Sequence, residues 1–561
     1  MSSKPSVYVR LAQLQPYVLT GVLLGLPALA FSGIRFEFLA WFGLVPMLVA
    51  LRSETSVRRW FGLSFVALST WFAVGQSWIL LTSPTVATVS FFVGGAALTV
   101  PMMTLFFLTR HLGRRRALWT LPFIWTAWEW IYHQCQFSFG GHTLANTQTN
   151  AIWLFQFMDL TGVWGMIFWV VLFNVLVTQA IDDWQGQATD QAGLAVPRTH
   201  LVEKLIWVTS VMVIPPLIYS AFCFWKYTKP PASDQNRLSV LMVQPNVNPW
   251  VETNPERKAA IVEKTVLLTD LAVEQTSPDL IVWPEIAIPL PYRQSPEVQT
   301  FLGQAITDWN APLLTGTLDL KSYATGMPRP KRLDIEGRDF EVFNTVLALT
   351  PNWNDPQVSA PAAVVSGISA KNRLVPFVEH IPYVEHVPWL RKLVARLGSN
   401  PILDQGATTT LTVQTKNQRL VKVGTQICYE SLYPESSARL VREGAQFLVF
   451  VTNDGWFSQT QGAEITAAAS RVRAIETRRS VARCANTGKT LFFDPLGRSY
   501  GEIPWWQERT TTADISLSQD LTLYTQYGDV FPLTCLWGSA LLLVALSGRT
   551  IFSKLCKEKL L

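Results

Sequence analysis

The chain has 561 residues, of which 49% are hydrophobic and only 15% are charged. This composition excludes a disordered chain, a collagen and a small disulfide-rich scaffold. The charges are unevenly distributed: residues 1–225 contain 20 of the 86 Asp, Glu, Lys and Arg residues, and residues 226–561 contain the other 66. No charged residue occurs from Trp60 to Thr109. Such a stretch is typical of membrane-spanning segments and not of a globular core.

The hydrophobic runs predict about eight spanning helices, because a span needs about 20 mostly apolar residues. They lie at 17–33, 36–51, 60–80, 87–109, 117–134, 161–181, 205–225 and 530–548. The first run could also be a signal peptide, since Lys4 and Arg10 precede it and Ala28-Leu29-Ala30 resembles a cleavage site. The further runs that follow favour an uncleaved first helix.

Basic residues are concentrated in every second connection between these runs. They occur before the first run, after the second, fourth and sixth runs, and in the tail after the eighth, whereas the other loops are nearly uncharged. The positive-inside rule therefore predicts that both termini are cytoplasmic and that the long segment 226–529 lies on the other side of a cell inner membrane. We expect a membrane domain of seven helices (1–225), an external domain (226–529), and an eighth helix with a cytoplasmic tail (530–561).

The segment 226–529 has 61 charged residues, which is an ordinary density for a soluble domain. Apolar runs bounded by turn residues predict buried strands, and helical patterns lie between some of them. The predicted strands are 238–243, 280–283, 312–317, 342–349, 420–427, 447–452 and 490–493, and the clearest helices are 256–274 and 462–479. This alternation predicts a layered α/β sandwich. No basic face for nucleic acid is visible in it.

Three segments contain residues that could carry out chemistry. Glu285 follows an apolar strand and could act as a base, because partial burial raises a carboxyl pKa. Lys371 could stabilise an oxyanion, and Cys428 follows a strand at a polar turn, which is where a nucleophile is exposed. Taken singly, each has a commoner explanation: a solvated Glu or Lys, or a buried structural thiol.

The remaining patterns exclude several kinds of cofactor. The spacing of His and Cys suits no zinc site, and there is no phosphate-binding glycine loop or dinucleotide-binding pattern. We therefore expect no metal and no cofactor. Only Cys428 and Cys484 lie in the external segment, and one disulfide between them is conceivable in an oxidising compartment.

Taken together, the order Glu, Lys, Cys at successive strand ends resembles the nitrilase superfamily, and more closely its membrane-bound branch, the apolipoprotein N-acyltransferases. The matching stretches are Val243–Asn246, Trp283–Glu285, Phe343–Thr345, Lys371–Glu379, Ile427–Glu430, Thr452–Phe457 and Arg471–Asn486. The layout of the spans, with the domain inserted between the seventh and the eighth, is also similar to that family. The resemblance implies a nitrilase-like αββα sandwich beside a polytopic α-helical membrane domain.

The resemblance also assigns roles to residues. It implies that Glu285 is the general base, Lys371 the oxyanion-stabilising lysine and Cys428 the nucleophile. Supporting roles fall to Glu379, Tyr429 and Glu430, and candidate substrate contacts are Asn344, Trp250, Trp456 and Phe457. The segment around Glu379 is echoed around Glu385, and the spacing from Lys371 selects Glu379.

The activity implied by the resemblance is acyl transfer through a Cys thioester. The donor would be a membrane phospholipid, and the acceptor the N-terminal diacylglyceryl-cysteine of an apolipoprotein. Two alternatives remain: a membrane-tethered amidase or nitrilase that hydrolyses a C–N bond, and a transporter or scaffold with a degenerate domain. The many spans disfavour the first, because one span would suffice as a tether, and the complete Glu-Lys-Cys set disfavours the second.

Overall fold

The computed structural model describes residues 7–29, 36–82, 84–186, 199–228, 236–251, 254–324, 327–328, 330, 333, 338–353, 363–384, 386–396 and 403–558. The chain divides into two compact units. The helical unit comprises Met1–Cys135, His142–Phe222 and Asp529–Leu561, and the sandwich unit comprises Gln136–Gly141 and Cys223–Gly528. The sandwich unit therefore includes six residues that lie between two helices of the helical unit in the sequence.

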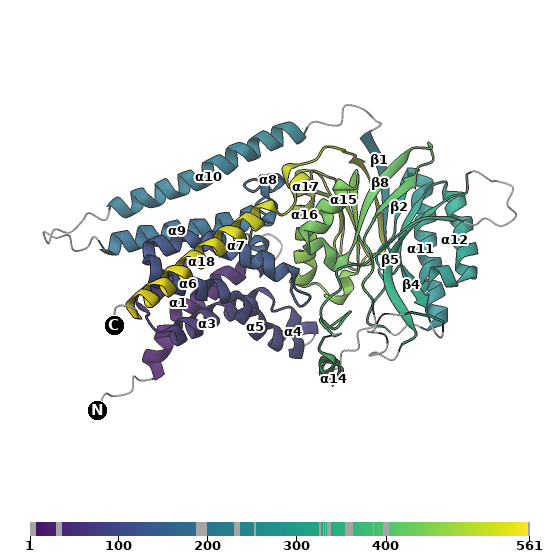
Figure 1. The fold of residues 1–561 in the computed structure, drawn as a ribbon. Helices are drawn as coiled ribbons and strands as arrows, with labels where there is room; N and C mark the ends of the chain where they lie inside the picture. Colours follow the sequence, from purple (N-terminus) through teal and green to yellow (C-terminus); the bar gives the residue numbers. More distant parts are fainter. Residues whose placement is uncertain are drawn as a thin grey trace. The chain divides into compact units, whose positions relative to one another are not determined.

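Long apolar helices make up most of the helical unit (Figure 1). The long helices are α1 (Val7–Gly25), α3 (Val57–Gly75), α5 (Pro84–Leu98), α6 (Val100–Leu112), α7 (Arg114–Gln134), α9 (Val163–Gly186), α10 (Thr199–Tyr227) and α18 (Val530–Glu558). Within the described residues, four stretches are long and apolar enough to cross a membrane: Val86–Leu112, Val163–Gln185, His200–Tyr227 and Val530–Gly548. They overlap four of the predicted spans, and the total of eight stays a prediction.

The predicted span at 36–51 is wrong as a single helix. This stretch contains the 3₁₀-helix η2 (Glu37–Trp41), the six-residue α2 (Val45–Ala50) and the start of η3 (Leu51–Ser53). Pro46 lies in the first turn of α2, where its missing N–H costs no hydrogen bond within the helix. Residues 36–51 are therefore as apolar as a membrane span, but they do not form one continuous helix.

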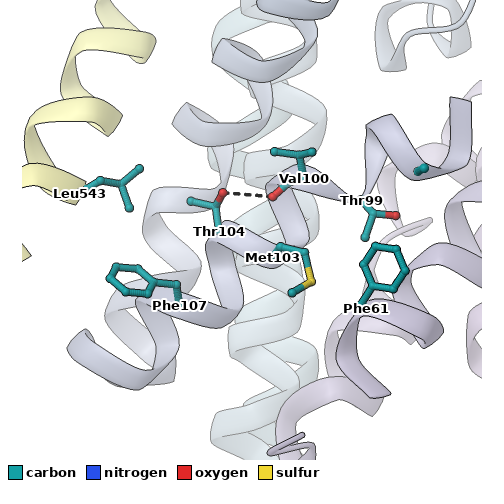
Figure 2. A pocket seen from close by; sticks show the side chains of 8 residues that line it. Phe61, Thr99, Val100, Met103, Thr104, Phe107 and Leu543 are labelled. Carbon is teal, nitrogen blue, oxygen red and sulfur yellow. Dashed lines mark hydrogen bonds between the residues drawn. The ribbon is translucent and has the colours of Figure 1, made fainter. Parts of the chain in front are cut away.

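An apolar groove of about 350 Å³ lies among α3, α6 and α18 of the helical unit (Figure 2). Its lining consists of six apolar side chains and two threonines: Phe61, Ala96, Thr99, Val100, Met103, Thr104, Phe107 and Leu543. The Thr104 hydroxyl is already satisfied, since it donates to the carbonyl oxygen of Val100 at 3.0 Å. This lining has no ionisable group that could act as an acid, a base or a nucleophile.

The described part of the sandwich unit contains two sheets. The seven-stranded sheet consists of β1 (Arg237–Gln244), β2 (Leu280–Val282), β3 (Ile288–Pro291), β4 (Leu313–Ser322), β5 (Phe340–Thr350), β6 (Val364–Ala370) and β13 (Arg509–Ser516). The six-stranded sheet consists of β7 (Thr410–Gln414), β8 (Leu420–Ile427), β9 (Phe447–Thr452), β10 (Val481–Ala485), β11 (Thr490–Phe493) and β12 (Ser499–Ile503). Strands β1, β2 and β4 are parallel to one another, as are β8, β9 and β10.

The two sheets pack face to face, and helices cover their outer faces (Figure 1). Side chains alternate along β1: Val240 and Met242 enter the core shared with β8 and β9, whereas Leu241 and Val243 pack on the helix side. Helices α11 (Pro255–Thr276) and α12 (Pro296–Trp309) cover the first sheet, and α15 (Pro434–Arg442) and α16 (Gln461–Thr477) cover the second. The predicted αββα sandwich is therefore confirmed.

Shorter helices complete the described structure. They are η1 (Leu26–Leu29), α4 (Ile79–Thr82), η4 (Leu144–Thr147), α8 (Met158–Thr161), η6 (Tyr292–Gln294), α14 (Pro388–Arg396), η7 (Cys428–Leu432), η8 (Asp454–Trp456) and α17 (Leu523–Tyr527). Two of them, η7 and η8, begin at the carboxyl ends of the parallel strands β8 and β9. In layered α/β folds this end of a parallel sheet is where polar side chains are exposed for binding and catalysis.

Candidate active site

Glu285, Lys371 and Cys428 all follow strands that end at the same edge of the sandwich. Glu285 comes three residues after β2, and Lys371 comes directly after β6. Strand β6 runs in the direction of β4 because two antiparallel pairings separate them. Cys428 comes directly after β8 of the other sheet. The two sheets thus each contribute to one cluster.

Lys371 is fully buried between two carboxylates. Its Nζ donates to Oε1 of Glu379 at 2.7 Å and to Oε1 of Glu285 at 3.4 Å. Glu379 is held in turn, since its Oε2 accepts from the backbone N–H of Val375 at 2.9 Å. The side chain of Asn344 donates to Oε1 of Glu285 at 2.7 Å. Each charged group of this cluster is therefore oriented by at least one neighbour, as preorganised catalysis requires.

Of the two glutamates in the repeated Val-Glu-His segments, Glu379 is the one that the structure places on Lys371. Glu385 lies outside the described residues. Asn344 lies beside the carboxylate of Glu285, and its expected contact with substrate stays a prediction. Its position there suits the orientation of the base.

The backbone bends sharply at Cys428. Its φ of +52° lies in the left-handed region, which costs free energy for a residue other than glycine and is found mainly at functional sites. The bend ends β8 and places the half-buried Cys428 in the field of the charges on Glu285 and Lys371. A strand followed by such a bend is the arrangement that presents a nucleophile above a sheet.

Burial and mutual charge shift the pKa values of the cluster. Burial raises the pKa of Glu285, and the ammonium of Lys371 opposes part of that effect. Burial would lower the pKa of Lys371, but the charges of Glu379 and Glu285 outweigh it and raise that pKa. Burial and the charge of Glu285 raise the pKa of Cys428 to about 12. Cys428 therefore rests as a thiol at neutral pH, and a base must take its proton.

Glu430 joins the end of β8 to the segment that carries Lys371. Its Oε2 accepts from the backbone N–H of Ile427 at 2.9 Å. Its Oε1 accepts from the backbone N–H of Asn372 at 2.8 Å and from the Thr408 hydroxyl at 2.7 Å. Glu430 is fully buried, so losing this carboxylate would leave several donors unsatisfied.

Tyr429 holds the segment Gln136–Gly141 against the site. Its hydroxyl donates to the carbonyl oxygen of Ser138, 291 residues earlier, at 2.8 Å, and it accepts from the backbone N–H of Gly140 at 3.2 Å. The hydroxyl of Tyr433 donates to that of Tyr429 at 3.2 Å and lies 3.1 Å from the Ser138 hydroxyl. The residue after Cys428 is thus fixed through its own side chain.

Two exposed tryptophans adjoin the loop that follows β9. Trp250 and Trp456 form an edge-to-face pair with ring centroids 5.2 Å apart, and the exposed fractions of the residues are 61% and 46%. The indole N–H of Trp250 donates to the carbonyl oxygen of Gly455 at 3.2 Å. Phe457 is half-buried and packs on Gly462. Substrate contact by these three aromatic residues stays a prediction.

Cys428 and Cys484 do not form a disulfide, and both are free thiols. Cys428 follows β8 and Cys484 lies on β10, and β9 runs between these two strands. Two strand spacings of about 4.8 Å separate them further than the Cα distance that a disulfide allows. The Sγ of Cys484 lies instead in the core, 3.4 Å from the carbonyl oxygen of Val243.

Sequence reasoning gave no role to four residues that contribute to the site. Gly316 of β4 lies against the backbone that carries Glu285, and a Cβ there would be 2.5 Å from the carbonyl oxygen of Pro284. Thr408 donates to Glu430, as described above. Arg483 and Asp454 form a buried bidentate ion pair with distances of 2.8 and 2.9 Å. Only the last had a signal, because a charged residue inside a buried strand needs a partner.

Two sheets between helices, with Glu, Lys and Cys at one edge, define a domain of the carbon–nitrogen hydrolase class. The family model named "Carbon-nitrogen hydrolase" matches residues 240–520. A second model, "Apolipoprotein N-acyltransferase N-terminal domain", matches residues 21–176.

Curated relatives extend this match to nearly the whole chain. The chain is 34% identical over 526 residues to "Apolipoprotein N-acyltransferase" of Chlorobaculum tepidum, covering 92% of this chain and 93% of that one. It is 28% identical over 538 residues to the protein of that name from Geobacter metallireducens, covering 93% of each. The chain belongs to the apolipoprotein N-acyltransferase family and is an acyltransferase of the membrane.

Among solved structures, Saccharomyces cerevisiae Nit3, a member of branch 10 of the nitrilase superfamily, is similar to the chain with a TM-score of 0.36 and 18% identity. The match covers 53% of this chain and 96% of that one. The fold class given above rests on the sheet topology and on the family model.

Gly316→Ala is expected to displace Glu285 and to lower acyl transfer at least about tenfold, because small misplacements of catalytic groups are costly. The added Cβ would lie 2.5 Å from the backbone N of Ile286 and 2.7 Å from Cα of Glu285, and backbone cannot move aside as a flexible side chain can. Acylation rate and thermal unfolding measure the effect. Gly62→Ala is the control, since no atom lies within 4 Å of a Cβ there. Equal effects of both substitutions would contradict the role of Gly316.

Proposed function

We propose that the chain transfers an acyl chain from a membrane phospholipid to the α-amino group of the diacylglyceryl-modified N-terminal cysteine of apolipoproteins. The family and the long apolar helices support this proposal. The observation that carries it is the buried Lys371 ammonium, 2.7 Å from Glu379 and 3.4 Å from Glu285, at the edge where Cys428 begins its bend. The residue roles are those that the sequence predicted.

The first half-reaction forms an acyl-enzyme. Glu285 takes the thiol proton as the sulfur of Cys428 attacks the ester carbonyl carbon of the phospholipid. The raised pKa of Glu285 suits this task, since a more basic carboxylate is the better proton acceptor. Lys371 faces the oxyanion of the tetrahedral intermediate. The intermediate collapses to a thioester, and the lysophospholipid leaves with the proton from Glu285.

The second half-reaction transfers the acyl chain to the amine. Glu285 accepts a proton from the attacking amino group, Lys371 stabilises the second oxyanion, and the thiol leaves with its proton restored. Removing one oxyanion donor typically costs about 10²–10³ in rate. A thioester suits this route because it reacts with an amine more readily than the starting ester does.

The proposal includes a location. The long apolar helices would hold the chain in the bacterial inner membrane, with the sandwich unit in the periplasm and both termini in the cytoplasm, as the alternation of basic loops predicts. Both substrates carry acyl chains, and exposing them to water costs about 0.8 kcal/mol per methylene. An enzyme anchored at the membrane surface avoids that cost. A soluble hydrolase of small substrates has no acyl chains to keep out of water.

A balance of products tests the function. Purified protein in detergent or vesicles is given a phospholipid with a labelled acyl chain and a diacylglyceryl-cysteine peptide. We expect N-acylated peptide and lysophospholipid in equal amounts. The competing hydrolase would instead release ammonia from a small amide and leave the peptide unmodified. Release of labelled free fatty acid without peptide acylation would also contradict the proposal.

A further inference from the structure

We infer that Thr452 is a further catalytic residue: its hydroxyl donates to Asp454 while Cys428 is a thiol and turns to donate to the sulfur when Cys428 is a thiolate. The inference rests on the proposed role of Cys428 as nucleophile. It adds an uncharged hydrogen-bond donor to the charged groups Glu285 and Lys371.

Strand pairing places Thr452 beside the nucleophile. Strands β8 and β9 are parallel neighbours, and Ile427 pairs with Val451. Thr452 is the last residue of β9, and Cys428 is the first residue after β8, so the two residues are neighbours at the edge where both strands end. Thr452 is 1% exposed, and a hydrogen bond from its side chain opposes part of the rise in the pKa of Cys428. The hydroxyl is thus held next to the sulfur and away from bulk water.

The partner of Thr452 on its other side is firmly anchored. Asp454 accepts from the two terminal nitrogens of Arg483 at 2.8 and 2.9 Å and from the backbone N–H of Lys489 at 3.0 Å. Thr452 donates to Oδ1 of Asp454 at 3.3 Å, which is the longest of these bonds. The carboxylate therefore remains paired when the threonine hydroxyl turns away, and the turn leaves no buried charge without a partner.

The Thr452 hydroxyl has one proton, so it can donate to only one partner at a time, either Asp454 or the sulfur of Cys428. When that proton points at Asp454, the threonine oxygen can only accept, so it receives the S–H of neutral Cys428. Once Glu285 has taken the thiol proton, the thiolate can only accept, and rotation about the Thr452 C–O bond supplies it with a donor. The proton of Thr452 never leaves its oxygen, so no further acid or base is needed.

The other groups that face the sulfur are charged. Glu285, Lys371 and Glu379 act on it from the seven-stranded sheet, and Arg483 acts on it from β10. The Lys371 ammonium donates hydrogen bonds to two carboxylates, and their negative charges reduce the stabilisation that it can offer to the thiolate. A hydrogen bond from Thr452 therefore adds stabilisation to the thiolate directly.

The rate of Cys428 alkylation at a fixed pH tests the inference. The full-length protein is treated with iodoacetamide at pH 8, and modification of the peptide containing Cys428 is followed over time by mass spectrometry. Thr452→Val retains the shape and branching of the side chain but removes the hydroxyl. We expect its alkylation to be about tenfold slower than that of the wild type, because a rise of about one unit in the pKa of Cys428 makes the thiolate fraction at fixed pH tenfold smaller. Acyl-enzyme formation should slow by a similar factor.

Thr452→Ser restores the hydroxyl and is expected to restore most of the reactivity. Thr265→Val on α11 removes a buried hydroxyl away from the site and should leave the alkylation rate unchanged. A wild-type alkylation rate in Thr452→Val overturns the inference, and so does a Thr452→Ser variant that reacts as slowly as Thr452→Val. Alkylation requires neither phospholipid nor lipoprotein, so a failure of the proposed function would leave this result standing.

Discussion

Cys428→Ser is expected to abolish acyl transfer, with a loss of about 10⁴-fold or more, while the fold remains intact. A hydroxyl is close in size to a thiol but is much harder to ionise and forms no thioester. The cluster of Glu285 and Lys371 already faces a thiol whose pKa is raised to about 12, and a hydroxyl would resist deprotonation still more. Mass spectrometry of the acceptor peptide measures the loss.

The matched control is Cys484→Ala. Cys484 is a fully buried thiol in the same sheet, but it faces the core and not the cluster. We expect this variant to transfer acyl chains at close to the wild-type rate, with only a loss of stability from the small cavity. Activity in Cys428→Ser near that of the wild type would remove Cys428 from the mechanism.

Lys371→Met is expected to be inactive and to lose about 3–5 kcal/mol of stability, because it leaves the buried carboxylate of Glu285 and the half-buried carboxylate of Glu379 without their cation. The methionine fills much of the volume of the lysine stem but offers no donor to Glu285, Glu379 or an oxyanion. The loss should depend on pH. Burial already raises the pKa of Glu285 in the presence of Lys371, and removing the ammonium raises it further.

The sign of that dependence follows from linkage. A carboxyl group whose pKa is higher in the folded than in the unfolded protein favours folding at low pH, and this stabilisation is lost as the pH rises through the folded value. Lys371→Met should therefore be closer to the wild type in stability at pH 5 than at pH 8. Thermal unfolding measures this, with Lys416→Met, at a half-buried surface lysine, as the control. A loss that is independent of pH would contradict the electrostatic cause.

The strands that sequence patterns predicted are those whose side chains are almost all buried. The runs at 420–427 and 447–452 coincide with β8 and β9, and 490–493 coincides with β11. Most of the missed strands carry polar residues or glycine, and β3 (Ile288–Pro291) is only four residues long and contains two prolines. Strands β12 and β13 have mostly exposed or half-buried residues, and β10 contains the buried Arg483, so none shows a continuous apolar run.

The site residues could be predicted where the residue type itself indicates the chemistry. They could not be predicted where their role depends on which strands pair in the fold. Glu285, Lys371 and Cys428 follow strands, and their order carried the resemblance. The need for glycine at position 316 arises only when β4 pairs beside the turn that carries Glu285. Likewise, Thr452 becomes a candidate only once the register of β8 and β9 is known.

The most direct test of the central claim is the mass of the protein after exposure to phospholipid alone. We predict a gain equal to one acyl chain, located on the peptide that contains Cys428, and lost on treatment with hydroxylamine because a thioester is cleaved by that reagent. Adding the diacylglyceryl-cysteine peptide should remove the adduct and yield one N-acylated peptide for each acyl-enzyme consumed. Acylated peptide formed without any adduct, or an adduct on a residue other than Cys428, would contradict the account.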